Sequence, residues 1–242
     1  MNAAPRVGVL GGTLDPMHLG HVEAALAARR SLDLDRVIVM PSRVPPHRPA
    51  QPTASPFHRF AMAALSVNGL EGLVVSDEEL CAEGPSYTAD TLERLQARGF
   101  SATQIFFITG ADAFAEIETW HRYPAVLDLA HFVVVSRPEF SVAALAGRLP
   151  GLMPRMQNVP AGAASVSRPA VFLIDARTPS VSSTEIRRRC AHGERLEGLV
   201  ARAVETHIRQ HGLYSRDGRD AADDQALHRA RQEAAEHLHG QD

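Results

Sequence analysis

The sequence predicts an α/β protein with a single Rossmann-like, doubly wound parallel sheet and a helical segment at its C-terminal end. Short apolar runs rich in β-branched residues recur along the chain, as expected of strands that are buried on both faces. Longer amphipathic stretches separate these runs, and repeats of this kind form right-handed crossovers between parallel strands. A length of 242 residues with 45% hydrophobic residues is sufficient for one such domain.

The expected elements alternate in chain order. Strands are predicted at residues 6–10, 36–40, 73–75, 105–108, 132–135 and 171–174. Helices are predicted at residues 19–30, 56–67, 88–98, 112–119, 124–129, 183–190 and 199–211. Residues 147–167 are rich in Gly, Pro, Ala and Ser without clear periodicity, which predicts a surface excursion before the last strand. In such sheets ligands bind outside the carboxyl ends of the strands.

The composition changes after Tyr214. Residues 1–214 are expected to form the domain, whereas residues 215–242 are charged, alanine-rich and nearly free of bulky apolar side chains. Leu227 and Leu238 can share one helical face, but two leucines stabilise a docked helix by a few kcal/mol at most. Ordering the segment costs roughly 1–2 kcal/mol per residue for the backbone alone. We therefore expect a mobile tail, or a helix that forms only against a partner chain.

The overall composition excludes several classes of protein. The net charge of −3 argues against a dedicated nucleic-acid binder. Cys81 and Cys190 lie far apart without a CxxC motif, so neither a disulfide framework nor a cysteine zinc site is indicated. No signal peptide and no apolar stretch of about 18 residues is found, which indicates a cytoplasmic protein without a membrane partner. The oligomeric state stays open, a homo-oligomer included.

All 25 basic residues are arginine. The absence of lysine excludes a Walker A loop, whose lysine contacts the β- and γ-phosphates. It also excludes a lysine Schiff base and a lysine that carries covalent AMP. Any phosphate chemistry must therefore use arginine, histidine and backbone amides.

The first motif is Gly-Gly-Thr-Leu-Asp-Pro-Met-His-Leu-Gly-His, residues 11–21, between the first strand and the first helix. Gly11 and Gly12 let the backbone approach a ligand closely, and the helix N-terminus that follows attracts anions. His18 and His21 are three residues apart and face the same side of a helical turn, with Gly20 keeping that side open. Two imidazole donors at this place suit a polyphosphate. A structural histidine pair and a zinc pair are the alternatives.

This motif resembles the signature of the HxGH nucleotidyltransferases, relatives of the class I aminoacyl-tRNA synthetases. The second half of that signature is expected after the last strand, where Val-Ser-Ser-Thr-Glu-Ile-Arg, residues 181–187, resembles the SSTxIR motif of the adenylyltransferases. Ser182 and Glu185 have capping-box spacing and should start a helix. Its free N–H groups and hydroxyls can hold the β- and γ-phosphates, and Arg187 can close on them with its planar fork.

Further stretches resemble the bacterial nicotinate-nucleotide adenylyltransferases. Residues 41–48, PSRVPPHR, resemble that family's PPHK loop, with Arg48 where lysine is usual. Residues 83–92, EGPSYTADTL, resemble its PSYTxDTL segment, and residues 110–122 its GAD…W region. Residues 136–138 follow the next strand, and residues 208–214 resemble its last helix. The resemblance covers residues 6–214.

The resemblance implies transfer of an adenylyl group from ATP to nicotinate mononucleotide, with Mg²⁺ arriving on ATP and no metal held by the protein itself. It implies catalytic roles for His18, His21 and Arg187. ATP would be bound by Gly11, Gly12, Thr13, Gly20, Gly110, Asp112, Ser182, Ser183 and Thr184. The mononucleotide would be bound by Asp15, His47, Arg48, Tyr87, Thr88, Trp120 and Arg137.

Two other functions stay in view. Pantetheine-phosphate adenylyltransferases share the fold and both signatures, but the segments around Tyr87 and Trp120 argue against that activity. A non-catalytic nucleotide sensor on the same fold would not need His18, His21 and Arg187 together. An aminoacyl-tRNA synthetase is excluded, because the chain has neither a lysine-rich second motif nor an anticodon domain.

Overall fold

A computed structural model describes residues 5–46, 53–138, 140–158 and 167–215, and it confirms the predicted fold class. Seven strands form one sheet in the order β3-β2-β1-β4-β5-β7-β6, and every neighbouring pair is parallel. The strands are β1 Val7–Gly12, β2 Arg36–Pro41, β3 Leu73–Val75, β4 Ile105–Gly110, β5 His131–Val135, β6 Met156–Asn158 and β7 Val171–Ile174.

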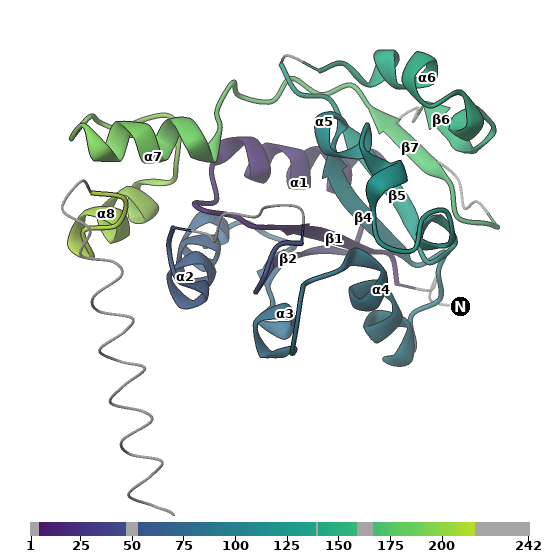
Figure 1. The fold of residues 1–242 in the computed structure, drawn as a ribbon, viewed down its shortest axis with the longest axis horizontal. Helices are drawn as coiled ribbons and strands as arrows, with labels where there is room; N and C mark the ends of the chain where they lie inside the picture. The colour runs from purple at the N-terminus through teal and green to yellow at the C-terminus, as the bar shows by residue number, and fades with distance from the viewer. Residues whose placement is uncertain (1–4, 47–52, 139, 159–166, 216–242) are drawn as a thin grey trace, which may run out of the picture.

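Helices cover both faces of the sheet, which is the doubly wound arrangement (Figure 1). They are α1 Leu19–Leu32, α2 Pro56–Val67, α3 Glu78–Cys81, α4 Thr88–Ala97, α5 Ala111–Phe114, α6 Leu145–Arg148, α7 Ser183–Ala191 and α8 Arg202–Gln210. The apolar side chains of α1 and the end of α2 pack with one face of the strands. Those of α4, α5 and α6 pack with the other face.

A third apolar cluster joins the C-terminal segment to the rest of the domain. Met62 of α2, Ile186 of α7 and Val204 and Ile208 of α8 belong to it, together with the buried Tyr214. Helix α8 therefore packs on α2, and α7 belongs to the same apolar cluster beside the sheet rather than on the sheet itself (Figure 1).

Four sequence-based predictions need correction. Residues 112–119 form only the short α5 and a 3-10 turn at Ile117–Thr119, and residues 124–129 form a 3-10 turn at Ala125–Asp128. Such short segments complete too few hydrogen bonds to extend an α-helix. The excursion at 147–167 contains the edge strand β6, which has only three residues and no apolar run to mark it. The last helix begins at Arg202 rather than Leu199.

The order of the strands determines where a ligand can bind. The chain leaves β1 on one side to build β2 and β3, and returns to β4 on the other side of β1. Crevices form outside the carboxyl ends of the strands at such a reversal. Strand β1 ends in Gly11-Gly12 and is followed by Thr13, and β4 ends in Gly110 and is followed by Ala111-Asp112; both segments are predicted site motifs.

Candidate active site

A cavity of about 300 Å³ lies at the carboxyl ends of β1 and β4. Many predicted site residues line it: Gly11, Gly12, Thr13, Asp15, His21, Tyr87, Thr88, Gly110, Asp112, Trp120, Arg137 and Ser183. Five others lie outside its lining: His18, Gly20, Ser182, Thr184 and Arg187. His47 and Arg48 fall outside the described residues.

The two signature histidines lie face to face at the start of α1. Their ring centroids are 3.7 Å apart with a 30° tilt between the planes, and the backbone N–H of His18 donates to Nδ1 of His21 at 3.3 Å. Burial, and secondarily the charge of Arg137, lower the pKa of His18 to about 3. His18 is therefore neutral at pH 7, so its ring donates through one nitrogen only.

Glycines are required where backbone and side chains crowd this site. A Cβ on Gly20 would lie 3.1 Å from the His18 ring, so a larger residue would press on the histidine pair. A Cβ on Gly110 would collide with the carboxylate of Asp112 and lie 2.9 Å from Nε of Arg137. Asp112 and Arg137 form an ion pair of 3.6 Å across the mouth of β4.

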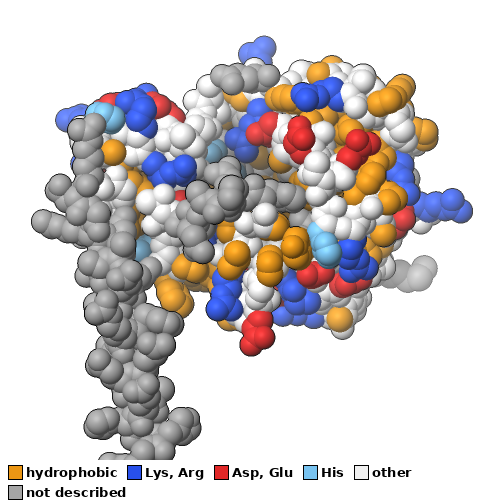
Figure 2. Space-filling view, viewed as in Figure 1, with side chains coloured by type: hydrophobic (Ala, Val, Ile, Leu, Met, Phe, Trp, Pro, Cys, Tyr) orange, Lys and Arg blue, Asp and Glu red, His pale blue; other side chains and the backbone are white. Residues whose placement is uncertain are grey.

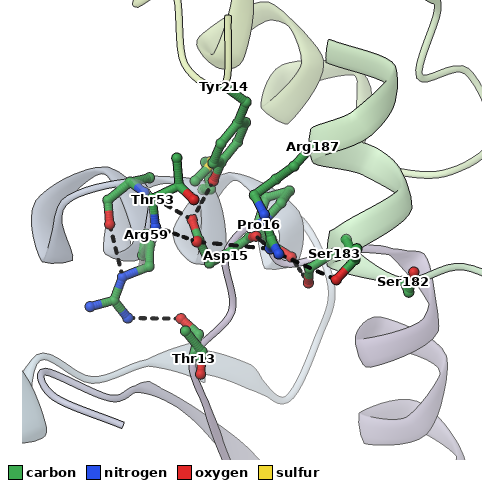
Figure 3. A network of polar contacts seen from close by, with 12 residues as sticks. Thr13, Asp15, Pro16, Thr53, Arg59, Ser182, Ser183, Arg187 and Tyr214 are labelled. Atoms are coloured by element: carbon green, nitrogen blue, oxygen red, sulfur yellow. Dashed lines mark hydrogen bonds and ion pairs between the residues drawn. The ribbon is translucent and has the colours of Figure 1, made fainter. Parts of the chain in front are cut away.

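Asp15 is the centre of a buried polar network that joins distant parts of the chain (Figure 3). Its side chain, 4% exposed, accepts hydrogen bonds from the backbone N–H groups of Thr53 and Ala54 and from the hydroxyl of Tyr214. The guanidinium of Arg187 lies 3.9 Å from the Asp15 carboxylate. Asp15 thus lines the cavity while its carboxylate is already held by the protein's own donors.

Arg59 was not among the predicted site residues, although it holds the cavity floor in shape. Its side chain is fully buried and donates to the carbonyls of Thr13 at 2.7 Å, Ser42 at 2.6 Å, and Ala54 and Arg43 at 3.2 Å. It connects the turns after β1 and β2 (Figure 3).

The pattern of α2 carried a signal for this role. Arg59 shares the buried face of the helix with Met62, Ala63, Ser66 and Val67. An arginine within an apolar helical stripe is buried, and a buried arginine needs carbonyl or carboxylate partners.

The second signature motif meets the first through α7. The hydroxyl of Ser183 donates to the carbonyl of Pro16 at 3.0 Å, and Arg187 donates to the carbonyl of Asp15 at 2.7 Å. Arg187 also donates to Oγ1 of Thr184 at 3.2 Å. The structure therefore brings the two motifs together, as the sequence predicted.

Only one half of the expected capping box forms at α7. Ser182 Oγ accepts from the N–H of Glu185 at 3.2 Å, but the Glu185 carboxylate pairs with Arg188 and Arg189 at 2.8 Å. Two charge-assisted contacts outweigh one bond to a backbone amide. They place mixed acidic and basic side chains on the surface of α7 (Figure 2).

Aromatic side chains line part of the cavity. Tyr87 stacks on His121 with ring centroids 4.2 Å apart, and Trp120 meets Phe107 edge to face at 6.0 Å. Thr88 also lines the cavity and is the first residue of α4, where the N–H groups of the first turn have no partner within the helix. This pairing of flat rings with a helix N-terminus suits a planar anionic group.

The cavity lining also contains a buried carboxylate. Glu79, 5% exposed, lines the cavity and accepts from the hydroxyl of Thr91 at 2.7 Å. Burial raises the pKa of Glu79 despite this hydrogen bond. Sequence analysis missed Glu79 because it lies in α3, a four-residue helix without a recognisable pattern.

Comparison with known proteins places the chain in a family. The cytidylyltransferase-like family model matches residues 9–189, the span from β1 to α7 that builds the cavity. The chain belongs to the cytidylyltransferase-like family. In the part of the chain that the structure describes, no helix is both long and apolar enough to cross a membrane.

Similar proteins identify the subfamily to which the chain belongs. A probable nicotinate-nucleotide adenylyltransferase of Chromohalobacter salexigens is 38% identical over 87% of this chain and 96% of the relative. One from Pseudomonas fluorescens is 39% identical over 86% of this chain and 97% of the relative. Within the family, the chain thus belongs to the nicotinate-nucleotide adenylyltransferases, enzymes of the nucleotidyltransferase class.

A solved structure supports the fold. The Plasmodium falciparum nicotinic acid mononucleotide adenylyltransferase, complexed with NaAD, superposes with a TM-score of 0.66 at 17% identity. It covers 87% of this chain and 98% of its own. The likeness in fold therefore extends over most of this chain.

Proposed function

We propose that this chain transfers the adenylyl group of ATP to nicotinate mononucleotide, giving nicotinate adenine dinucleotide and pyrophosphate for NAD biosynthesis. The observation that carries the proposal is one cavity whose lining combines two sets of residues. Gly11, Gly12 and His21 belong to the first signature motif, and Tyr87, Thr88 and Trp120 belong to the aromatic part of the lining. The relatives named above carry the same activity in their names.

In the proposed reaction an oxygen of the mononucleotide phosphate attacks the α-phosphorus of ATP. A bond forms between that oxygen and the α-phosphorus, the bond to the bridging oxygen of the β-phosphate breaks, and pyrophosphate leaves with the electron pair. The second pKa of a phosphate monoester is near 6, so the attacking phosphate is ionised at pH 7 and needs no general base. Positioning and charge stabilisation then supply the catalysis.

The chain's own residues divide these tasks. His21, at the cavity wall, donates to the phosphate oxygens, and the neutral His18 packs behind it and fixes its ring. Nδ1 of His18 is buried without a hydrogen-bond partner among the described residues, a costly state that is typical of functional sites. Ser183, which lines the cavity, and Arg187 face the departing pyrophosphate, together with Ser182 and Thr184.

The remaining predicted residues hold the two substrates. Gly110 and Asp112 would meet the adenosine ribose, and Tyr87, Thr88 and Trp120 would hold the nicotinate ring. Arg137, which lines the cavity and pairs with Asp112, would bind the mononucleotide. Asp15 supports the loop after β1 through its hydrogen bonds rather than through a free carboxylate.

Mg²⁺ fits this site as part of the nucleotide complex. Asp15, Glu79 and Asp112 are the carboxylates of the cavity lining, and each has a partner within the protein. Mg²⁺ commonly keeps several waters and is held through substrate phosphates in such enzymes. When bound, it would neutralise charge on the phosphates of ATP.

The test is a pyrophosphate-release assay with ATP and three acceptors: nicotinate mononucleotide, nicotinamide mononucleotide and phosphopantetheine. We expect kcat/KM for the nicotinate form to exceed that for the nicotinamide form by at least about tenfold, equivalent to about 1.4 kcal/mol. The reason is the carboxylate, which meets the N-terminus of α4 beside Tyr87. Equal efficiency for both would refute the acceptor assignment, and turnover of phosphopantetheine alone would refute the function.

A further inference from the structure

A cluster of three histidines lies outside the cavity, between α2 and α8. His58 comes from the first turn of α2, and His207 and His211 come from the end of α8. The last two are four residues apart, so their rings project from the same side of the helix. One ligand nitrogen from each residue can be chosen such that all lie within 4.8 Å of one another.

The distances are close to those of a metal site. Nδ1 of His58 lies 3.1 Å from Nε2 of His207. Ligands on a tetrahedral zinc ion, at about 2.0–2.1 Å from the metal, are about 3.3 Å from each other. The third ring, that of His211, is exposed and can rotate to complete the set.

The packing of the two helices holds the three rings together. His58 and His207 are half-buried where α2 packs against α8. The ring centroids of His58 and His211 are 4.8 Å apart, and those of His207 and His211 are 4.4 Å apart. Imidazole nitrogens are among the commonest protein ligands of transition metals.

We propose that His58, His207 and His211 form a binding site for a divalent transition-metal ion, with zinc as the best match and a fourth position open to water. Three imidazole nitrogens suit zinc, copper and nickel, whereas magnesium and calcium take oxygen ligands. None of the three histidines lines the catalytic cavity. This ion is therefore distinct from any Mg²⁺ that arrives with ATP.

The ion would act as a clamp between α2 and α8. The segment after α8 contains Tyr214, whose hydroxyl donates a hydrogen bond to Asp15 at 2.7 Å. Arg59, the residue after His58, holds the floor of the cavity. A metal at the histidine cluster would therefore fix both helices that support the Asp15 network.

The test uses the full chain without a polyhistidine tag, stripped with a chelator and then titrated with Zn²⁺ by calorimetry. We expect one zinc per chain at this site, and an affinity at least about 100-fold weaker in His58→Ala and His207→Ala, since even outer-shell changes weaken metal sites by 10–100-fold. With zinc at about 100 times its Kd, the Tm should rise by about 5 °C or more in the wild type alone.

Two matched controls exclude other histidines. His192→Ala removes an exposed histidine elsewhere, and a triple alanine variant removes His228, His237 and His239, which follow Ser215 in the sequence. Both should bind zinc like the wild type. If His58→Ala and His207→Ala bind zinc as tightly as these controls, or if the wild type binds none, the proposal is overturned.

A spectroscopic arm guards against variants that fail to fold. His211→Cys keeps a metal ligand at an exposed position, because thiolate also binds zinc and cobalt. Co²⁺ added to this variant should give a sulfur-to-metal charge-transfer band that the wild type lacks. A folded His211→Cys protein without that band would also overturn the proposal.

Discussion

Replacing Tyr214 by Phe removes a single oxygen from the centre of the Asp15 network. In the structure, the hydroxyl of Tyr214 donates to Oδ1 of Asp15 at 2.7 Å, and both side chains are about 5% exposed or less. Phenylalanine has the same ring, so the apolar contacts of Tyr214 with the third apolar cluster, which contains Met62, Val204 and Ile208, are kept. The substitution therefore removes the hydrogen bond to a buried carboxylate, together with a long contact of the hydroxyl with Sδ of Met62 at 4.0 Å.

The magnitude follows from the state of Asp15. After the substitution its carboxylate keeps the N–H groups of Thr53 and Ala54 and the nearby Arg187. A hydrogen bond to a charged group contributes about 1.5–3 kcal/mol, and little water can replace it at this depth. We expect the free energy of unfolding to fall by that amount, and the Tm to fall by about 3–12 °C.

The assay is urea denaturation at pH 7 together with a thermal melt. Tyr123→Phe is the matched control, since Tyr123 is half-buried and its hydroxyl has no hydrogen-bond partner among the described residues. This control should change stability by less than about 0.5 kcal/mol. If Tyr214→Phe is as stable as Tyr123→Phe, the hydroxyl does not stabilise Asp15 and the reasoning fails.

Three further predictions concern catalysis, pH and the tail. His21→Ala should lower kcat by about 10²–10³, the usual effect of losing one transition-state donor, while His192→Ala leaves kcat unchanged; unaltered turnover of His21→Ala would remove its assigned role. Burial lowers the pKa of His131 to about 4. Below pH 6.5 the unfolded chain therefore binds a proton at His131 that the folded protein does not bind, and the free energy of unfolding decreases as the pH is lowered. Denaturation at pH 7 and pH 5 should therefore show that His131→Asn loses about 2 kcal/mol less than the wild type over this interval. Removal of residues 215–242, most of which fall outside the described residues, should leave kcat unchanged and the Tm within about 5 °C; a larger drop would show that the tail packs on the domain.

Sequence patterns predicted the sheet well because its signals are local. Runs such as Phe132–Val135 are buried on both faces, and apolar runs of this kind are identifiable without knowing their neighbours. The strand β6 and the 3-10 turn at Ala125–Asp128 were not predicted, because their signals are not local. Such short elements are held by tertiary contacts rather than by their own propensity.

The candidate site was predicted in part. Residues at or next to strand ends, such as Gly12, Gly110 and Asp112, line the cavity as expected from the topology. Arg59 was missed even though helical periodicity places it on the buried face of α2. The sequence did not indicate that the carboxylate of Asp15 accepts hydrogen bonds from Thr53, Ala54 and Tyr214.

Asp15 shows why the rest lay beyond the sequence. Its partners Thr53, Arg187 and Tyr214 are 38, 172 and 199 residues away along the chain. No helical or strand periodicity connects positions that lie so far apart in the sequence, so the sequence pattern does not predict these contacts. Only the packing of α7 and α8 on α2 brings these segments together. The aspartate that follows the Gly11–Gly12 end of β1 therefore couples the position of the C-terminal helices to the shape of the cavity. We expect a substitution at Tyr214 to change the position of His21 as well.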